Sequence, residues 1–191
     1  MSRFALAVIT LVALAACGGK DRAPEMAQTT TPVDPRCFGG RVLSFKDLVA
    51  EVVIPGEETC ASGTFQVVFT RGTDTLTTLT ETRVGTVGFI GTADVDGDGR
   101  GEFFVSTTEE GDAAKGMLFA YTETEAGMGR MMLADLDSAQ SVGYTGHDRF
   151  GFGGADQLVR AFPRAGADTA WFAYSHGEKK WNSVARPAWI R

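Results

Sequence analysis

The chain has 191 residues, a formal net charge of −6 and two histidines. Because an acidic surface repels nucleic-acid phosphates and anionic lipids, we expect no nucleic-acid partner and a preference for cationic proteins. The histidines, His147 and His176, stand in no spacing with the three cysteines that is typical of zinc sites, so zinc is not expected.

The chain begins MSRFALAVITLVALAACGGK. Arg3 supplies a positive charge, Phe4–Leu14 is an apolar run too short to span a bilayer, and small residues precede Cys17. This segment resembles a bacterial lipoprotein signal, which implies a signal peptide over residues 1–16, cleavage before Cys17 and a diacylglycerol on its sulfur. We therefore expect a periplasm-facing envelope protein, lipid-anchored to a membrane; Gly18, in place of an acidic residue, favours the outer membrane. An ordinary secretory signal is the alternative, and it also predicts export.

Residues 17–36 are rich in Pro and Thr and offer little for a core to bury, which predicts a flexible tether. Such a tether has a root-mean-square reach of roughly 25 Å, enough to lift a domain clear of lipid headgroups. The remaining residues, 37–191, are a normal length for one domain. With Cys17 consumed by lipid, Cys37 and Cys60 are the remaining pair, and an oxidising periplasm favours a disulfide between them.

We expect residues 37–191 to form an all-β domain, a small antiparallel β-sandwich or open barrel. Short runs rich in Val, Phe, Tyr and Thr alternate with turn residues, and no long helical pattern competes. Pro163 is expected to end the strand before it, whereas Ser44–Val53 fits either a helical turn or a strand. A β-propeller is not expected, because the domain is too short for four or more blades. The expected strands are Phe65–Thr70, Leu76–Thr82, Val87–Ala93, Phe103–Thr107, Met117–Thr122, Leu158–Phe162, Ala170–Tyr174 and Lys180–Val184.

The segment Asp94–Glu102 reads DVDGDGRGE and lies between two expected strands. Carboxylates at alternate positions of a tight, glycine-containing turn can converge on one hard cation, and calcium is the expected ion. The segment resembles the calcium loops of FG-GAP and integrin-type repeats, in which a backbone carbonyl at the position of Arg100 also serves. It is not an EF-hand, because Val105 stands where that loop needs a bidentate Glu.

The alternative to a metal-binding loop is an Asp/Gly-rich hairpin turn that holds no metal. The expected ligand residues are Asp94, Asp96, Asp98, Arg100 and Glu102.

Four segments, in this order, resemble the periplasmic inhibitors of invertebrate-type lysozyme. They are Val87–Val105, which includes the acidic motif, Val142–Phe150 (VGYTGHDRF), Leu158–Pro163 (LVRAFP) and Trp171–Tyr174 (WFAY). The likeness covers residues 85–184 and implies a small β-sandwich with a loop that enters the cleft of a lysozyme. It therefore predicts a lipid-anchored inhibitor that protects peptidoglycan, with a cationic lysozyme as its protein partner.

One loop departs from the family pattern. The family has a Ser-Gly-x-x-Tyr loop soon after the acidic motif, whereas residues 106–116 here read STTEEGDAAKG. Acidic side chains would meet the catalytic carboxylates of a glycosidase with like charge, so a basic rim is the better contact. The alternative function is a calcium-stabilised envelope binding module without lysozyme inhibition. The candidate binding residues in this loop and the later turn are Thr107, Glu109, Glu110, Asp112, His147 and Asp148.

The sequence does not predict an enzyme. His147 lies beside Asp148, but no serine or cysteine nucleophile stands in a motif that would place it next to this pair. Asp135 and Asp137 are two carboxylates without the further features of a glycosidase. We therefore expect a binding protein.

Overall fold

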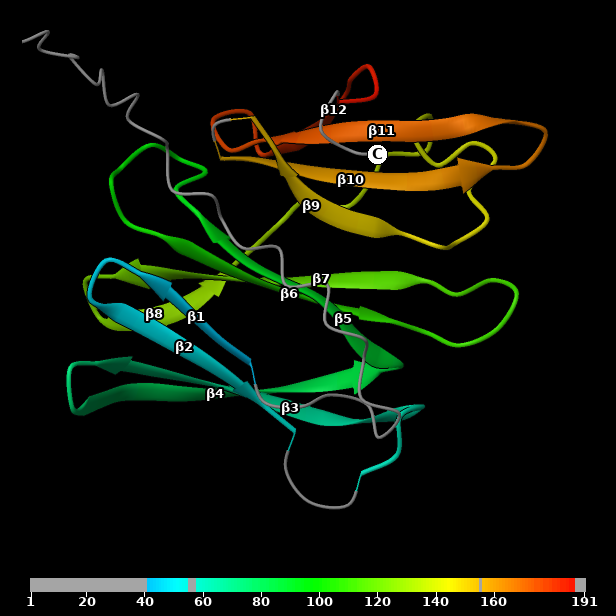
Figure 1. Cartoon of the computed structure of the whole chain (residues 1–191). Helices are drawn as coiled ribbons and strands as arrows, with labels where there is room; N and C mark the ends of the chain where they lie inside the picture. Colours follow the sequence, from blue (N-terminus) through cyan, green and yellow to red (C-terminus); the bar gives the residue numbers. More distant parts are fainter. Residues whose placement is uncertain (1–40, 55–57, 155, 188–191) are drawn as a thin grey trace, which may run out of the picture. The chain divides into compact units, whose positions relative to one another are not determined.

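Twelve β-strands and no helix make up the part of the chain that the computed structural model describes, residues 41–54, 58–154 and 156–187 (Figure 1). They form three antiparallel sheets of four strands, each a meander in chain order. The expected all-β class is confirmed. Within these residues there is no helix of the length and hydropathy that a membrane span needs. The expected signal peptide 1–16, the tether 17–36 and the lipid-carrying Cys17 lie outside the described residues.

We refer to the three sheets by their order in the chain. The N-terminal sheet contains β1 (Arg41–Phe45), β2 (Leu48–Val53), β3 (Ser62–Arg71) and β4 (Asp74–Val84). The central sheet contains β5 (Thr86–Ala93), β6 (Glu102–Thr108), β7 (Gly116–Thr124) and β8 (Gly127–Met131). The C-terminal sheet contains β9 (Arg149–Gly153), β10 (Gln157–Arg164), β11 (Ala167–Ser175) and β12 (Lys180–Ser183).

The central sheet is covered on both faces. Strand β6 is buried along its first six residues, a pattern typical of a strand packed on both sides. Phe103 and Val105 belong to the core shared with the N-terminal sheet, whereas Phe104 belongs to the core shared with the C-terminal sheet. The three sheets therefore stack through two cores, which is a sandwich with a third layer.

Aromatic side chains fill both cores. In the first core, Phe69 packs edge-to-face on Phe103 and Tyr121, with ring centroids 5.5 and 5.8 Å apart. In the second core, Phe152 packs in the same way on Phe104 at 5.6 Å. Each fully buried side chain of this kind contributes about 1.5–3 kcal/mol. Strand β5 also contacts β1 and β9, so the loop that follows β5 lies near both outer sheets.

The expected strands are confirmed as β3 to β7 and β10 to β12, with small differences at their ends. Residues 44–53 belong to the β1–β2 hairpin, whose turn places Lys46 at a φ of 54°, so the helical alternative is wrong. Pro163 does not end its strand, because β10 continues to Arg164 through a bulge that accommodates a residue without an N–H. Strands β1, β8 and β9 were not expected.

A buried arginine fixes the chain around Cys60. Arg83 is 1% exposed and donates hydrogen bonds to the carbonyl oxygens of Thr59, Cys60 and Gly85 at 2.8, 3.2 and 2.6 Å. Its charge is thus satisfied by protein oxygens rather than by water. Cys60 is disulfide-bonded, and its expected partner, Cys37, lies outside the described residues.

Candidate metal centre and paired loops

The acidic motif forms the loop between β5 and β6, as expected from the sequence. Two glycines allow it to turn tightly, since Gly97 and Gly99 have φ values of 77° and 83°. The carboxylate of Asp94 accepts hydrogen bonds from the backbone N–H groups of both glycines, at 2.8 and 2.9 Å. Asp96 accepts one from the N–H of Asp98 at 3.0 Å. These bonds turn the aspartate side chains back over the loop.

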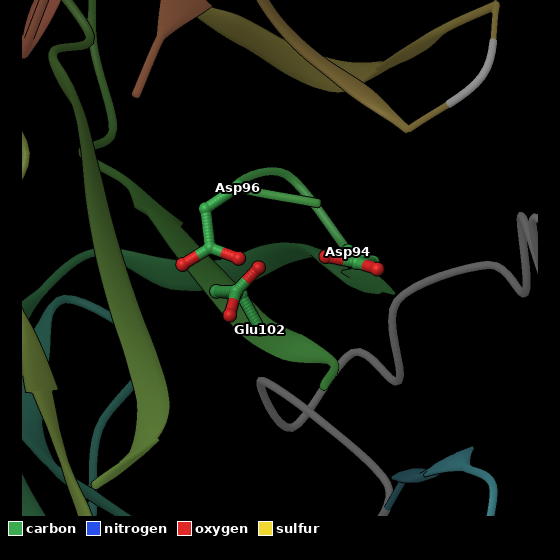
Figure 2. Close-up of side chains that lie close together, drawn as sticks. All are labelled: Asp94, Asp96 and Glu102. Atoms are coloured by element: carbon green, nitrogen blue, oxygen red, sulfur yellow. The ribbon is translucent and has the colours of Figure 1, made fainter. Parts of the chain in front are cut away.

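Three carboxylates of the motif come together. Oxygen atoms of Asp94, Asp96 and Glu102 all lie within 4.8 Å of one another, and Figure 2 shows the three side chains gathered at the loop. Asp94 directly follows β5 and Glu102 begins β6, so the hairpin itself sets them side by side. This acidic triad can hold a metal ion, because hard cations bind clustered carboxylate oxygens.

Glu102 is the buried member of the acidic triad. Its side chain is inaccessible to solvent and accepts hydrogen bonds from the N–H of Val95 at 2.9 Å and the hydroxyl of Thr122 at 3.1 Å. Burial, together with the nearby charges of Asp96 and Asp98, raises the pKa of Glu102 to about 7. Ionising Glu102 near neutral pH is therefore costly unless positive charge lies beside it.

Asp98 does not belong to the acidic triad. Its carboxylate accepts hydrogen bonds from the backbone N–H of Arg100 at 2.7 Å and from the Arg100 guanidinium at 2.8 Å. These bonds hold the pKa of Asp98 below its ordinary value. The expected set of four carboxylates is thus divided: Asp98 forms an ion pair with Arg100, and the other three have no lysine or arginine within ion-pair distance in the described structure.

The β5–β6 loop, which carries the acidic motif and is called the acidic loop below, also contacts both outer sheets. From the N-terminal sheet, the Lys46 ammonium donates to the carbonyl oxygen of Gly99, and Phe45 packs so tightly that a Cβ on Gly101 would lie 2.3 Å from its ring. From the C-terminal sheet, Nε2 of His176 lies 3.8 Å from Oδ2 of Asp96. Sequence reasoning missed Lys46 and Thr122, because they reach the loop from distant turns and strands and belong to no local motif. The sequence does not place His176 at this loop either, because its spacing from the cysteines bears only on a zinc site.

A second feature joins the β6–β7 loop to the turn before β9. The N–H of His147 donates to the carbonyl of Ala114 at 2.5 Å, and Nε2 of His147 lies 3.0 Å from the carbonyl oxygen of Asp112. Gly146 makes this approach possible: its φ is 82°, and a Cβ there would lie 2.7 Å from the Ala114 oxygen. We call residues 109–115 with 146–147 the paired loops. The two regions that the sequence suggested for binding are therefore parts of one surface.

Two of the candidate binding residues are not available to a partner. Thr107 is fully buried on β6, and Asp148 is 6% exposed. The Asp148 carboxylate accepts hydrogen bonds from the Gly116 N–H at 2.8 Å, from the Arg160 guanidinium at 2.7 Å and from the Tyr144 hydroxyl. These contacts make Asp148 an internal brace behind the paired loops. Of the remaining candidates, Glu109 is half-buried, and the exposed ones are Glu110, Asp112 and His147.

No family model, curated protein or solved structure matches the chain. The resemblance to lysozyme inhibitors therefore depends on the four segments of the sequence that carry it. The acidic triad and the paired loops are therefore the features of the molecule that indicate a function.

Proposed function

We propose that the protein is an envelope binding module that takes up calcium at Asp94, Asp96 and Glu102. The observation that supports this most directly is the buried Glu102 carboxyl, which faces two further carboxylates without a lysine or arginine partner in the described structure. A divalent cation would remove the repulsion between them and allow Glu102 to ionise.

The donor set favours calcium over other ions. All three side chains offer oxygen, the ligand of hard cations, and the described structure places no cysteine beside them. Calcium accepts six to eight oxygens in flexible geometry, so three carboxylates with backbone carbonyls and water can complete its shell. Magnesium demands a stricter octahedron and releases its water reluctantly. Because the acidic loop contacts the β1–β2 and β11–β12 turns, a cation bound there would also stabilise the packing of the outer sheets.

The test is thermal unfolding of the full chain in EDTA and in calcium. At a calcium concentration a hundredfold above the dissociation constant, linkage adds about 2.7 kcal/mol and should raise the melting temperature by about 5–10 °C. Glu102→Gln should lose this rise, whereas Glu125→Gln, an exposed control in the β7–β8 turn, should keep it. An unchanged melting temperature and no heat of calcium binding in the native chain would refute the proposal.

We propose, as a second function, that the paired loops bind a lysozyme. Two segments that the family resemblance implicates, residues 109–115 and 146–147, are hydrogen-bonded to each other and braced by Asp148. A braced surface loses little entropy on binding. Glu110 and Asp112 carry exposed negative charge, which suits the basic rim of a cationic enzyme. A lipid anchor at Cys17 would hold such an inhibitor beside the peptidoglycan it protects.

Titration of the full chain against invertebrate-type, goose-type and chicken-type lysozymes tests this function separately. Stoichiometric loss of activity of one class is expected, weakened by Glu110→Lys with Asp112→Lys and unaffected by Glu125→Lys. Repeating the titration in EDTA tells whether calcium is required. If none of the three enzymes is inhibited, the lysozyme proposal fails while calcium binding remains to be judged by its own test.

A further inference from the structure

Strand β4 leaves a long edge of the N-terminal sheet without a partner in the described residues. It has eleven residues, and among the described strands it pairs only with β3. The other strands at sheet edges are shorter: β5 has eight residues, β1, β8 and β9 have five, and β12 has four. Long unpaired edges present backbone donors and acceptors to any strand that can align with them.

The usual protections of an edge strand are few in β4, and those present do not block pairing. It contains no proline and no lysine, and its one irregularity lies near the β3–β4 turn. Its inward charges are already neutralised within the protein: Glu81 is bonded to Arg130 of β8 through Nε at 2.6 Å, and Arg83 is bonded to backbone carbonyls. These charges therefore do not repel an incoming strand.

The outward side chains of β4 are uncharged over most of its length. Leu76 and Val84 are 41% and 45% exposed, and three exposed threonines at positions 78, 80 and 82 lie between them. Threonine and β-branched side chains directly opposite one another on two strands stabilise the pair. The strand is thus suited to pair with another of the same composition.

We propose that β4 pairs with β4 of a second copy of this chain. An antiparallel register about a two-fold axis at Leu79 places Thr78 opposite Thr80 and Leu76 opposite Thr82. The same register places Glu81 and Arg83 opposite threonines, so no like charges meet. Two N-terminal sheets then join as one sheet of eight strands, an isologous contact that closes on itself. A second copy is taken as the occupant because its β4 meets this register without like charges facing each other; a strand from another protein would leave the native chain monomeric on its own.

A charge exchange tests this proposal on the full chain, purified with two different tags in one non-ionic detergent. The native chain is expected to self-associate. The double variant Thr78→Lys with Thr80→Lys places a lysine of one copy opposite a lysine of the other at two points in the register. It should weaken self-association by about tenfold or more. Thr78→Glu with Thr80→Glu should do the same. An equimolar mixture of the two double variants should restore association, which a misfolded variant could not do.

Ser183→Lys with Ala185→Lys adds the same charge at exposed positions in and just after the edge strand β12 and serves as the matched control. It should associate as the native chain does. A native chain that stays monomeric at all concentrations overturns the proposal. So does a lysine variant that dimerises as tightly as the native chain, or a mixture of opposite charges that gains nothing over either variant alone.

Discussion

Two buried carboxylates of this protein are stabilised in different ways. Asp148 accepts a guanidinium bond from Arg160, a backbone bond from Gly116 and a hydroxyl bond from Tyr144. Glu102 is equally inaccessible, but within the described part of the chain it accepts only two neutral donors, beside two further carboxylates. Burial of a carboxylate alone therefore does not identify a binding site. The carboxylate with its own cation is structural, and the one without is where an external cation would act.

The largest expected effect breaks the structural member of this pair. Asp148→Ala leaves the Arg160 guanidinium, which is 15% exposed, without its carboxylate and removes the brace from Gly116 and Tyr144. Removing one partner of a buried pair costs about 3–5 kcal/mol. Urea unfolding should show this loss, whereas Asp135→Ala, at an exposed position, should stay within about 0.5 kcal/mol of the native chain.

The second prediction concerns pH and the acidic triad. Glu102 has a folded pKa of about 7 against an ordinary value of 4.5, so between these values the folded chain keeps a proton that the unfolded chain has lost. In EDTA, stability should therefore fall as pH rises from 4.5 through 7, by up to about 1.4 kcal/mol per pH unit, and then level off. Urea midpoints across this range measure the slope.

The control for this slope is Glu102→Gln, whose side chain cannot titrate. Its stability should therefore depend less on pH than that of the native chain. Calcium should flatten the native profile as well, because it favours the ionised carboxyl. If native and variant profiles coincide in EDTA, then Glu102 is not the group that titrates.

A smaller effect is expected at the paired loops. Gly146→Ala adds a Cβ 2.7 Å from the Ala114 oxygen at a φ of 82°, so the turn must move away from the β6–β7 loop. A loss of about 1–3 kcal/mol and faster amide exchange at His147 should follow. Gly111→Ala, at a φ of 106° with nothing within 4 Å, is the matched control, because it carries the backbone strain without the collision.

The smallest effect is expected at Asp98. Asp98→Asn breaks an exposed ion pair with Arg100 and should change stability by about 0.5 kcal/mol or less. Its effect on calcium affinity, measured by calorimetry, should be much weaker than that of Asp96→Asn, which removes a member of the acidic triad. Equal losses of affinity would mean that Asp98 turns from Arg100 to the ion and that all four carboxylates bind it.

Most of the strands and the acidic turn could be predicted from the sequence, because both depend on local patterns. Phe65–Thr70 alternates buried and half-buried residues, as a strand with one face in the core does, and the glycines of the turn permit its tight loop. The weakly patterned strands β8 (GMGRM) and β9 (RFGFG) could not be recognised in this way. They are strands because β7 and β10 supply their hydrogen-bond partners.

Tertiary structure alone decided which side chains of the candidate site meet. Lys46 reaches the acidic loop across 53 residues of sequence, and Asp148 reaches Gly116 across 32. No local pattern records such contacts, since they depend on how the sheets stack. The same stacking buries Glu102 and Thr107 on β6, and so separates the buried member of the acidic triad from the few side chains left for a partner. The burial of a side chain and the groups it contacts depend on how distant segments pack. The acidic motif could therefore be recognised in the sequence, whereas the burial and hydrogen-bond partners of its carboxylates could not.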